Sequence, residues 1–134
     1  IRIIYSGNSA YGGLTAPAGS YYSGLKHHSG VNQQATMSQN ISLSNPNGDY
    51  QLAFQTAYRP SKACTSLGVT IVDVSSGGAL IDETVTVTGA FVAHTIDFTN
   101  QGYTEVTLTL KNECVLNTDT AIFMDSVQLS QVLT

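Results

Sequence analysis

Hydrophobic residues alternate with polar ones in short runs along the chain, and Gly, Asn, Pro and Ser separate the runs. In the clearest run, Tyr50, Leu52 and Phe54 alternate with Gln51 and Ala53. A period of two is typical of strands with one buried face and one wet face, and no segment has a convincing helical period. The pattern predicts nine strands, at residues 2–6, 20–26, 35–43, 50–58, 68–74, 79–88, 92–99, 104–111 and 120–132.

These strands predict an all-β fold, a two-layer antiparallel β-sandwich formed by residues 1–134 as a single domain. Turn-forming residues lie between the predicted strands at 45–49, 75–78 and 100–102. No linker divides the chain, and its 134 residues are enough to bury one core.

Charge and hydropathy exclude two classes of partner. The chain has 5 Lys and Arg residues against 9 acids, a net charge of −4, so we expect no nucleic-acid partner. Its apolar runs fall far short of the roughly 20 residues that a membrane-spanning helix needs, so we expect no membrane insertion. The sequence begins at Ile1, without an initiator Met or a leader, which indicates a processed product, an excised domain or an incomplete chain.

Two cysteines, Cys64 and Cys114, lie in polar stretches that read as loops. We predict a disulfide between them, with two free thiols as the alternative. Closing a loop of this size would stabilise the fold by about 4 kcal/mol in the chain-entropy model. A disulfide also indicates an oxidising compartment, so we expect an extracellular, secreted protein.

One N-glycosylation acceptor triplet occurs, at Asn40-Ile41-Ser42. Alternation places Met37, Gln39 and Ile41 on the inward side of the predicted strand and leaves Asn40 facing solvent. Asn40 is therefore a candidate glycosylation site in a secreted protein.

The last predicted strand contains an acid in an apolar run, AIFMDSVQL at residues 121–129. Strict alternation places Phe123, Asp125, Val127 and Leu129 on one side. An ionised carboxylate among apolar neighbours needs a partner. Backbone N–H groups or an arginine are the favoured partners for Asp125, and a metal ion is the alternative.

The order of five motifs resembles that of jelly-roll carbohydrate-binding modules and other galactose-binding-like extracellular domains. The motifs are GLKHHSGVNQQATMSQNISL, YQLAFQTAYRP, FVAHTIDFT, VTLTLKN and AIFMDSVQL, and the resemblance covers the chain from about residue 20 onward. It implies a glycan ligand. It also implies that Tyr58 and Arg59 lie at a ligand-gripping rim, although Tyr58 continues the inward face of its strand and core packing is favoured for it. Asp125 matches an acidic position that often lies near a structural calcium in these modules.

The chain departs from these domains at its start. They usually begin with a further strand or two and a Trp, whereas here that opening is missing and Trp is absent. We expect an unpaired sheet edge, which another copy of the chain could fill by strand addition. Of the adjacent residues Tyr21 and Tyr22, only one can point inward.

Catalytic and transition-metal motifs are weak or absent in the sequence. There is no Gly-x-Ser-x-Gly motif, and the acids are scattered over strands and turns, so we predict that the protein is not an enzyme. His27 and His28 are adjacent on an extended segment and diverge, and His94 lies on the apolar face of its strand. We expect no transition-metal site from these histidines.

The leading hypothesis is a secreted, non-enzymatic recognition or adhesion module that binds glycans. The alternative is a structural subunit of an extracellular fibre or surface assembly that polymerises by β-strand complementation and carries a glycan at Asn40. The two differ in partner: a glycan in the first, copies of the same chain in the second.

Overall fold

A computed structural model describes residues 2–26, 34–114 and 120–133. These residues form nine strands and one short 3-10 helix, η1 (Ser9–Tyr11). Each predicted strand is confirmed to within two residues at either end. No helix among the described residues is long and apolar enough to cross a membrane. The strands are β1 (Arg2–Tyr5), β2 (Tyr21–Lys26), β3 (Thr36–Ser42), β4 (Asp49–Tyr58), β5 (Ser66–Asp73), β6 (Ala79–Thr86), β7 (Val92–Thr99), β8 (Glu105–Asn112) and β9 (Ala121–Gln131).

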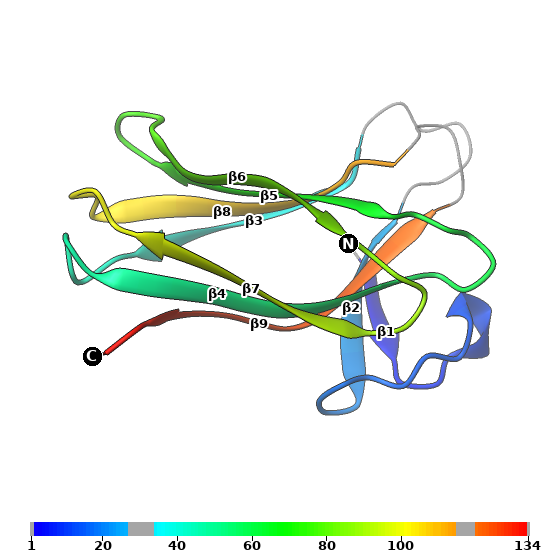
Figure 1. Cartoon of the computed structure of the whole chain (residues 1–134). Helices are drawn as coiled ribbons and strands as arrows, with labels where there is room; N and C mark the ends of the chain where they lie inside the picture. Colours follow the sequence, from blue (N-terminus) through cyan, green and yellow to red (C-terminus); the bar gives the residue numbers. More distant parts are fainter. Residues whose placement is uncertain (1, 27–33, 115–119, 134) are drawn as a thin grey trace.

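The strands form two antiparallel sheets packed face to face (Figure 1). The five-stranded sheet has the order β1-β2-β9-β4-β7, and the four-stranded sheet has the order β3-β8-β5-β6. Strands that are far apart in sequence, such as β2 and β9, pair with each other. The predicted all-β sandwich is confirmed.

The main core lies between the sheets and is built from the apolar side of each alternating strand. Leu52 and Phe54 contribute from β4, Val69 from β5, and Leu108 and Leu110 from β8. Each such side chain adds roughly 1.5–3 kcal/mol by leaving water, so the period-two pattern decides which face of every strand turns inward.

A bulge interrupts β9. The register against β4 shifts between the Ala53–Gln128 pair and the Gln55–Asp125 pair, and Ser126 has a positive φ of 54°. The extra residue reverses the alternation. Phe123 therefore lies on the outer face of the five-stranded sheet, whereas Leu129 packs against the core between the sheets. The prediction that Phe123, Asp125, Val127 and Leu129 share one side was wrong for this reason.

A second, smaller apolar cluster lies on the outer face of the five-stranded sheet. Residues 6–20, which we call the covering segment, fold over it; Figure 1 shows them as the blue connection between β1 and β2. Tyr22 is buried in this cluster and burial raises its pKa, whereas 60% of Tyr21 is exposed. As expected from their adjacent positions, one of the two tyrosines is buried and the other is exposed. The cluster comprises Ile4, Ala16, Tyr22, Ala121 and Phe123, with Tyr11, Leu14 and Phe91 packed against it.

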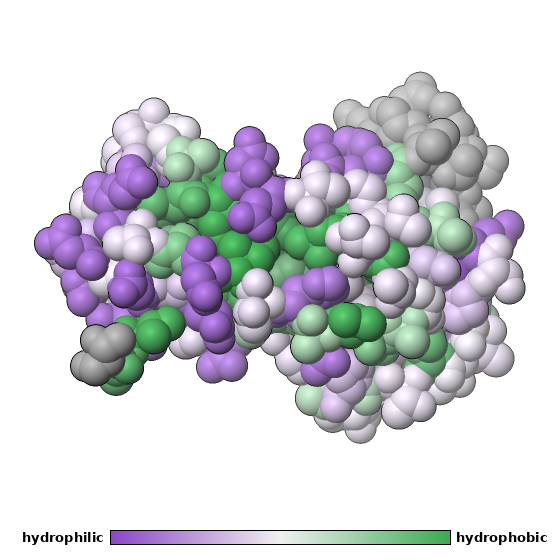
Figure 2. Space-filling view, in the orientation of Figure 1, coloured by the Kyte–Doolittle hydropathy of each residue, from purple (hydrophilic) through white to green (hydrophobic). Residues whose placement is uncertain are grey.

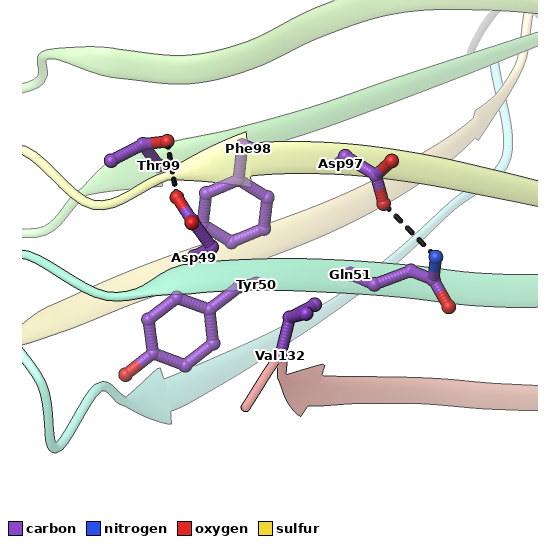
Figure 3. Close-up of a pocket in the computed structure, with 7 residues that line it drawn as sticks. All are labelled: Asp49, Tyr50, Gln51, Asp97, Phe98, Thr99 and Val132. Atoms are coloured by element: carbon purple, nitrogen blue, oxygen red, sulfur yellow. Dashed lines mark hydrogen bonds between the residues drawn. The ribbon is translucent and has the colours of Figure 1, made fainter. Parts of the chain in front are cut away.

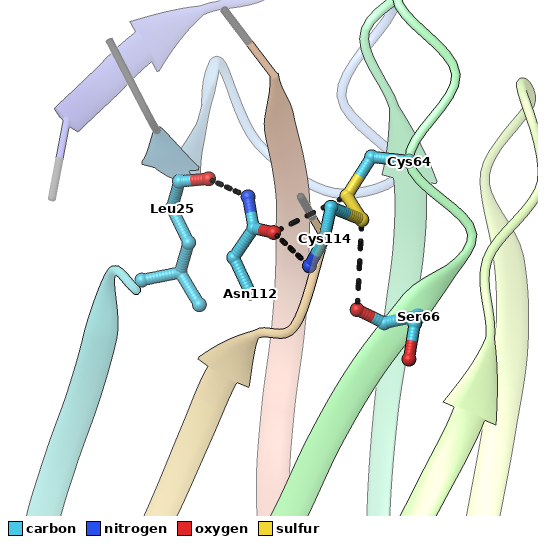
Figure 4. Close-up of a disulfide and its surroundings, with 5 residues drawn as sticks. All are labelled: Leu25, Cys64, Ser66, Asn112 and Cys114. Carbon is cyan, nitrogen blue, oxygen red and sulfur yellow. Dashed lines mark hydrogen bonds between the residues drawn. A yellow bond between two sulfur atoms is a disulfide. The ribbon is translucent and has the colours of Figure 1, made fainter. Parts of the chain in front are cut away.

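The predicted disulfide between Cys64 and Cys114 is present, with the two Cα atoms 5.7 Å apart (Figure 4). Beside it, the fully buried Asn112 joins the two sheets: its Nδ2 donates to the Leu25 carbonyl of β2 at 3.1 Å, and its Oδ1 accepts from the Cys114 amide at 3.0 Å. The disulfide and Asn112 together fasten one end of the sandwich.

The sheets end in four edge strands, β1 and β7 in one sheet and β3 and β6 in the other. Among the described strands, β1 pairs only with β2, so the expected open edge exists. However, each of the other three edges is open in the same sense, and the structure does not distinguish β1 as a docking edge.

In the orientation of Figure 2, β6 and β7 face the viewer. Between them apolar residues lie at the bottom of a hollow, and hydrophilic residues flank it.

Candidate ligand-binding face

The outer surface of the five-stranded sheet has an uncovered half, formed by β4, β7 and the second part of β9. Antiparallel register aligns its outward side chains in rows across the strands. One row pairs Gln51 with Asp97 and Ser130, and the next pairs Ala53 with Thr95 and Gln128. We call this surface the polar face; it comprises Asp49, Gln51, Ala53, Gln55, Thr95, Asp97, Thr99, Gln128 and Ser130.

A hollow of about 350 Å³ lies at one end of the polar face, where β4 begins and β7 ends (Figure 3). Two hydrogen bonds across the strands fix its polar side chains. Thr99 Oγ1 donates to Asp49 Oδ1 at 2.6 Å, and Gln51 Nε2 donates to Asp97 Oδ1 at 3.0 Å. The lining residues are Asp49, Tyr50, Gln51, Asp97, Phe98, Thr99 and Val132.

The hollow has a rigid base. Tyr50 and Phe98 stack with ring centroids 5.6 Å apart and an interplanar angle of 14°, and both are more than 90% buried. The Tyr50 hydroxyl also accepts a hydrogen bond from the Asn45 amide at 3.0 Å. Because the rings are packed from below, Asp49 and Asp97 are presented from a backbone that has little freedom to move.

The polar face carries carboxylates and lacks cationic residues. Strands β4, β7 and β9 contain Asp49, Asp97 and Asp125 but no Lys or Arg. Carboxylate, amide and hydroxyl groups suit a ligand rich in hydroxyl groups, and the negative charge disfavours an anionic ligand. Ala53, in the middle of the face, has a much smaller side chain than Gln51 and Gln55, its outward neighbours on β4.

Tyr58 and Arg59, the residues expected at a ligand rim, do not line the polar face. Tyr58 is partly buried and packs against the core between the sheets. Arg59 Nη2 donates to the Ala10 carbonyl at 3.0 Å, and its guanidinium lies 5.5 Å from the centre of the Tyr11 ring. Arg59 therefore contacts the covering segment.

Asp125 accepts hydrogen bonds from backbone amides. The Ala18 N–H donates to Oδ2 at 3.0 Å, and the Ser126 N–H donates to Oδ1 at 2.8 Å. Calcium requires six to eight oxygen ligands. Residues 2–26, 34–114 and 120–133 bring no three His, Cys, Asp or Glu side chains together in a group that could hold a metal.

Of the three histidines, only His94 lies among the described residues. His27 and His28 lie outside the described residues. His94 Nε2 lies 2.8 Å from Thr56 Oγ1, and its ring stacks on Phe54 at 5.3 Å. Burial lowers the pKa of His94, which favours the neutral ring. His94 therefore packs at the margin of the core.

Asn40 is exposed on the edge strand β3 and accepts a hydrogen bond at Oδ1 from Thr107 Oγ1 at 2.7 Å. The neighbouring Ser38 and Thr109 hydroxyls are likewise hydrogen-bonded to each other, at 2.9 Å. The glycosylation acceptor is thus accessible on the outer surface of the four-stranded sheet, opposite the polar face.

The sequence pattern predicted that Gln51 lies on the wet side of its strand, but it did not predict the polar face. The signal was present in two separate runs, QLAFQ in β4 and VAHTIDFT in β7, where Thr95, Asp97 and Thr99 share a side. Only the register of β4 with β7 and β9 brings these groups together, and that register depends on long-range pairing.

No family model and no curated protein matches the chain. Solved structures do match it in fold. One described as "CBM4 structure and function" has 13% sequence identity, a TM-score of 0.64, and coverage of 97% of this chain and 94% of its own. A family 16 carbohydrate-binding module-2 has 18% identity, a TM-score of 0.63 and coverage of 86% and 79%.

The N-terminal cellulose-binding domain of β-1,4-glucanase C from Cellulomonas fimi has 14% identity and a TM-score of 0.63, covering 98% of this chain and 90% of that domain. At these identities the likeness shows the fold alone. The resemblance to jelly-roll carbohydrate-binding modules is therefore confirmed: this chain has the β-sandwich fold of those modules.

Proposed function

We propose that the protein is a non-enzymatic module that binds a neutral glycan chain on the polar face. The observation that carries the proposal is the row of cross-strand pairs, Asp49 with Thr99 and Gln51 with Asp97, which lines a hollow on an uncovered sheet face. The fold that it shares with carbohydrate-binding modules supports the same ligand class.

Binding would use the hydrogen-bonding capacity of the face. Sugar hydroxyls donate to the carboxylates of Asp49 and Asp97 and accept from the amide groups of Gln51, Gln55 and Gln128. Hydrogen bonds to charged groups contribute about 1.5–3 kcal/mol each, more than neutral ones. The absence of Lys and Arg from β4, β7 and β9 favours a neutral glycan over one that carries carboxylate or sulfate groups.

A non-catalytic role fits the two acids of the hollow. Asp49 and Asp97 are each held by a neighbouring side chain through a hydrogen bond to one carboxylate oxygen. The carboxylates therefore act as fixed acceptors for ligand hydroxyls.

We also propose that the protein is extracellular. The Cys64–Cys114 disulfide supports an oxidising compartment, and Asn40 is an exposed acceptor for N-glycosylation. The alternative role as a fibre subunit has no specific observation in its favour, because β1 is one of four open edges.

The test compares two variants that each remove one carboxylate charge from opposite sheets. Soluble neutral and acidic polysaccharides are screened on an array, and affinities for the retained neutral chains are measured by calorimetry. Asp97→Asn should weaken binding by at least tenfold, since a charge-assisted hydrogen bond is lost. Glu105→Gln, on the outer surface of the four-stranded sheet, should leave affinity unchanged. Equal effects of the two variants, or binding of acidic glycans alone, would contradict the proposal.

A further inference from the structure

We propose that the aromatic cluster beneath the covering segment is a second, covered subsite on which a sugar ring stacks, and that long glycans reach it when residues 6–20 lift from the sheet. This inference rests on the proposed function, because the subsite extends the polar face. It concerns Tyr22, Phe91 and Phe123.

The three aromatic rings form a compact group. Tyr22 lies between the other two, with ring centroids 5.0 Å from Phe123 and 5.3 Å from Phe91. Gly24 makes room for this packing, since a Cβ there would lie 3.0 Å from Ile4 Cδ1 and 3.4 Å from the Phe123 ring. Apolar rings of this kind are the surfaces on which sugar rings stack, and the polar face itself has none.

The aromatic group continues the polar face along β4. Gln55 pairs with Asp125, and the next outward residue, Ala57, pairs with Phe123. Outward positions therefore run without a break from Asp49 to Ala57, a span of about 26 Å at roughly 3.3 Å per residue. A long glycan lying along β4 would meet hydrogen-bonding groups first and aromatic rings next.

In the closed cluster, the Tyr22 hydroxyl is buried without a hydrogen-bond partner among the described residues. Tyr22 is 3% exposed, and its hydroxyl has no hydrogen-bond partner in the part of the chain that the structure describes. Burial without a partner destabilises the closed arrangement. A ligand hydroxyl that enters the opened subsite would supply the missing bond.

Charged side chains attach the covering segment to the body of the protein at two places. Asp125 accepts from the Ala18 amide, and Arg59 donates to the Ala10 carbonyl, each at 3.0 Å. Two cations contact the Tyr11 ring of the segment: Lys26 Nζ lies 5.4 Å and the Arg59 guanidinium 5.5 Å from the ring centre. These contacts break without disturbing any strand pairing.

The covering segment is also held together by its own bonds. The Gly7 amide donates to the Leu14 carbonyl at 2.8 Å, and the Ala16 amide donates to Ser6 Oγ at 2.9 Å. Gly7 and Gly19, near its two ends, have positive φ values of 79° and 66° and nothing within 4 Å of a Cβ position. Opening by rotation about Gly7 and Gly19 would move residues 8–18 together and break the Gly7–Leu14 and Ala16–Ser6 hydrogen bonds. If a ligand binds only the open form, its apparent affinity equals its affinity for the open form multiplied by the fraction of protein that is open.

Hydrogen exchange tests the opening without any ligand. We expect the amides of Gly7, Ala16 and Ala18 to exchange together, faster than amides in β4 and β9. Arg59→Gln should accelerate these three amides several-fold, whereas Lys62→Gln, an equal charge change on a nearby exposed residue, should not. Exchange of the three amides only with global unfolding would overturn the inference.

Calorimetry with cello-, xylo- and galacto-hexasaccharides and the matching disaccharides tests the subsite. Arg59→Gln should raise affinity for the bound hexasaccharide severalfold. Tyr22→Phe, which removes only the unpartnered hydroxyl, should lower that affinity about fivefold without lowering the melting temperature. Neither variant should change disaccharide binding.

The outcomes separate the two proposals. Unchanged hexasaccharide affinity in both variants, with the Asp97→Asn effect intact, would overturn the covered subsite and leave glycan binding on the polar face. No binding of any oligosaccharide or array glycan by the wild-type protein would overturn the proposed function, and the subsite with it.

Discussion

At the residue scale, a few buried polar side chains are held in place by hydrogen bonds. Asn112 and Asp73 are both among the few buried polar residues of the described chain. Each has its partners in the structure, as physical chemistry requires of buried polar groups. Removing one partner of such a buried bond should therefore lower the free energy of unfolding more than removing an exposed hydrogen bond.

Asn112→Ala should destabilise the protein by about 2–4 kcal/mol, because it leaves the Leu25 carbonyl and the Cys114 amide without their partner. The free energy of unfolding is measured with urea under oxidising conditions. Asn47→Ala, at an exposed turn residue, serves as the control and should change it by less than about 0.5 kcal/mol. A loss for Asn112→Ala no larger than the control's would show that the bridge between the sheets is dispensable.

Ser76→Ala should destabilise the protein near neutral pH but not at low pH. The Ser76 hydroxyl donates to Asp73 Oδ2 at 2.6 Å and, with the Ser76 amide, holds the pKa of Asp73 below its ordinary 3.8. A lowered pKa in the folded state contributes stability above pH 4, and that contribution is lost as pH falls through the folded pKa. Thermal unfolding of both proteins between pH 7 and pH 2 checks this. A difference that stays constant over the range would rule out Asp73 as its source.

At the element scale, the strands could be predicted from alternation and the bulge could not. The run from Tyr50 to Phe54 shows which side is buried, and nine such runs are enough to predict a sandwich. In β9, however, Val127 and Leu129 continue the alternation of Phe123 in sequence, so nothing local indicates that one residue is inserted. The polar face could not be predicted either, because predicting it requires the pairing of β4 with β7 and β9.

Ser126→Gly should preserve or raise stability by up to about 1 kcal/mol, because Ser126 has a φ of 54°, a conformation that glycine adopts without strain. Ser130→Gly, in the extended part of the same strand, should instead lower stability by about 0.5–1 kcal/mol. Urea unfolding of the two variants gives the comparison. A larger loss for Ser126→Gly than for Ser130→Gly would contradict the bulge.

At the scale of the whole molecule, the two outer surfaces of the sandwich differ in how much is covered. The four-stranded sheet displays Asn40 and a set of hydroxyl groups to solvent, whereas the covering segment closes half of the five-stranded sheet. The fold class and the likeness to carbohydrate-binding modules followed from the order of motifs. The division of one face into an open and a covered half could not be predicted, because residues 6–20 show no alternation of hydrophobic and polar residues.

The bulge at Ser126 has a consequence for how this molecule can diversify. Because it reverses the alternation within β9, substitutions before it alter the covered aromatic half, and substitutions after it alter the open polar half. Loss of that one residue would turn Gln128 and Ser130 toward the core and Leu129 toward water. Strand length, and not composition alone, therefore determines which chemistry β9 offers to a ligand, and the two halves of the face are free to evolve or be redesigned independently.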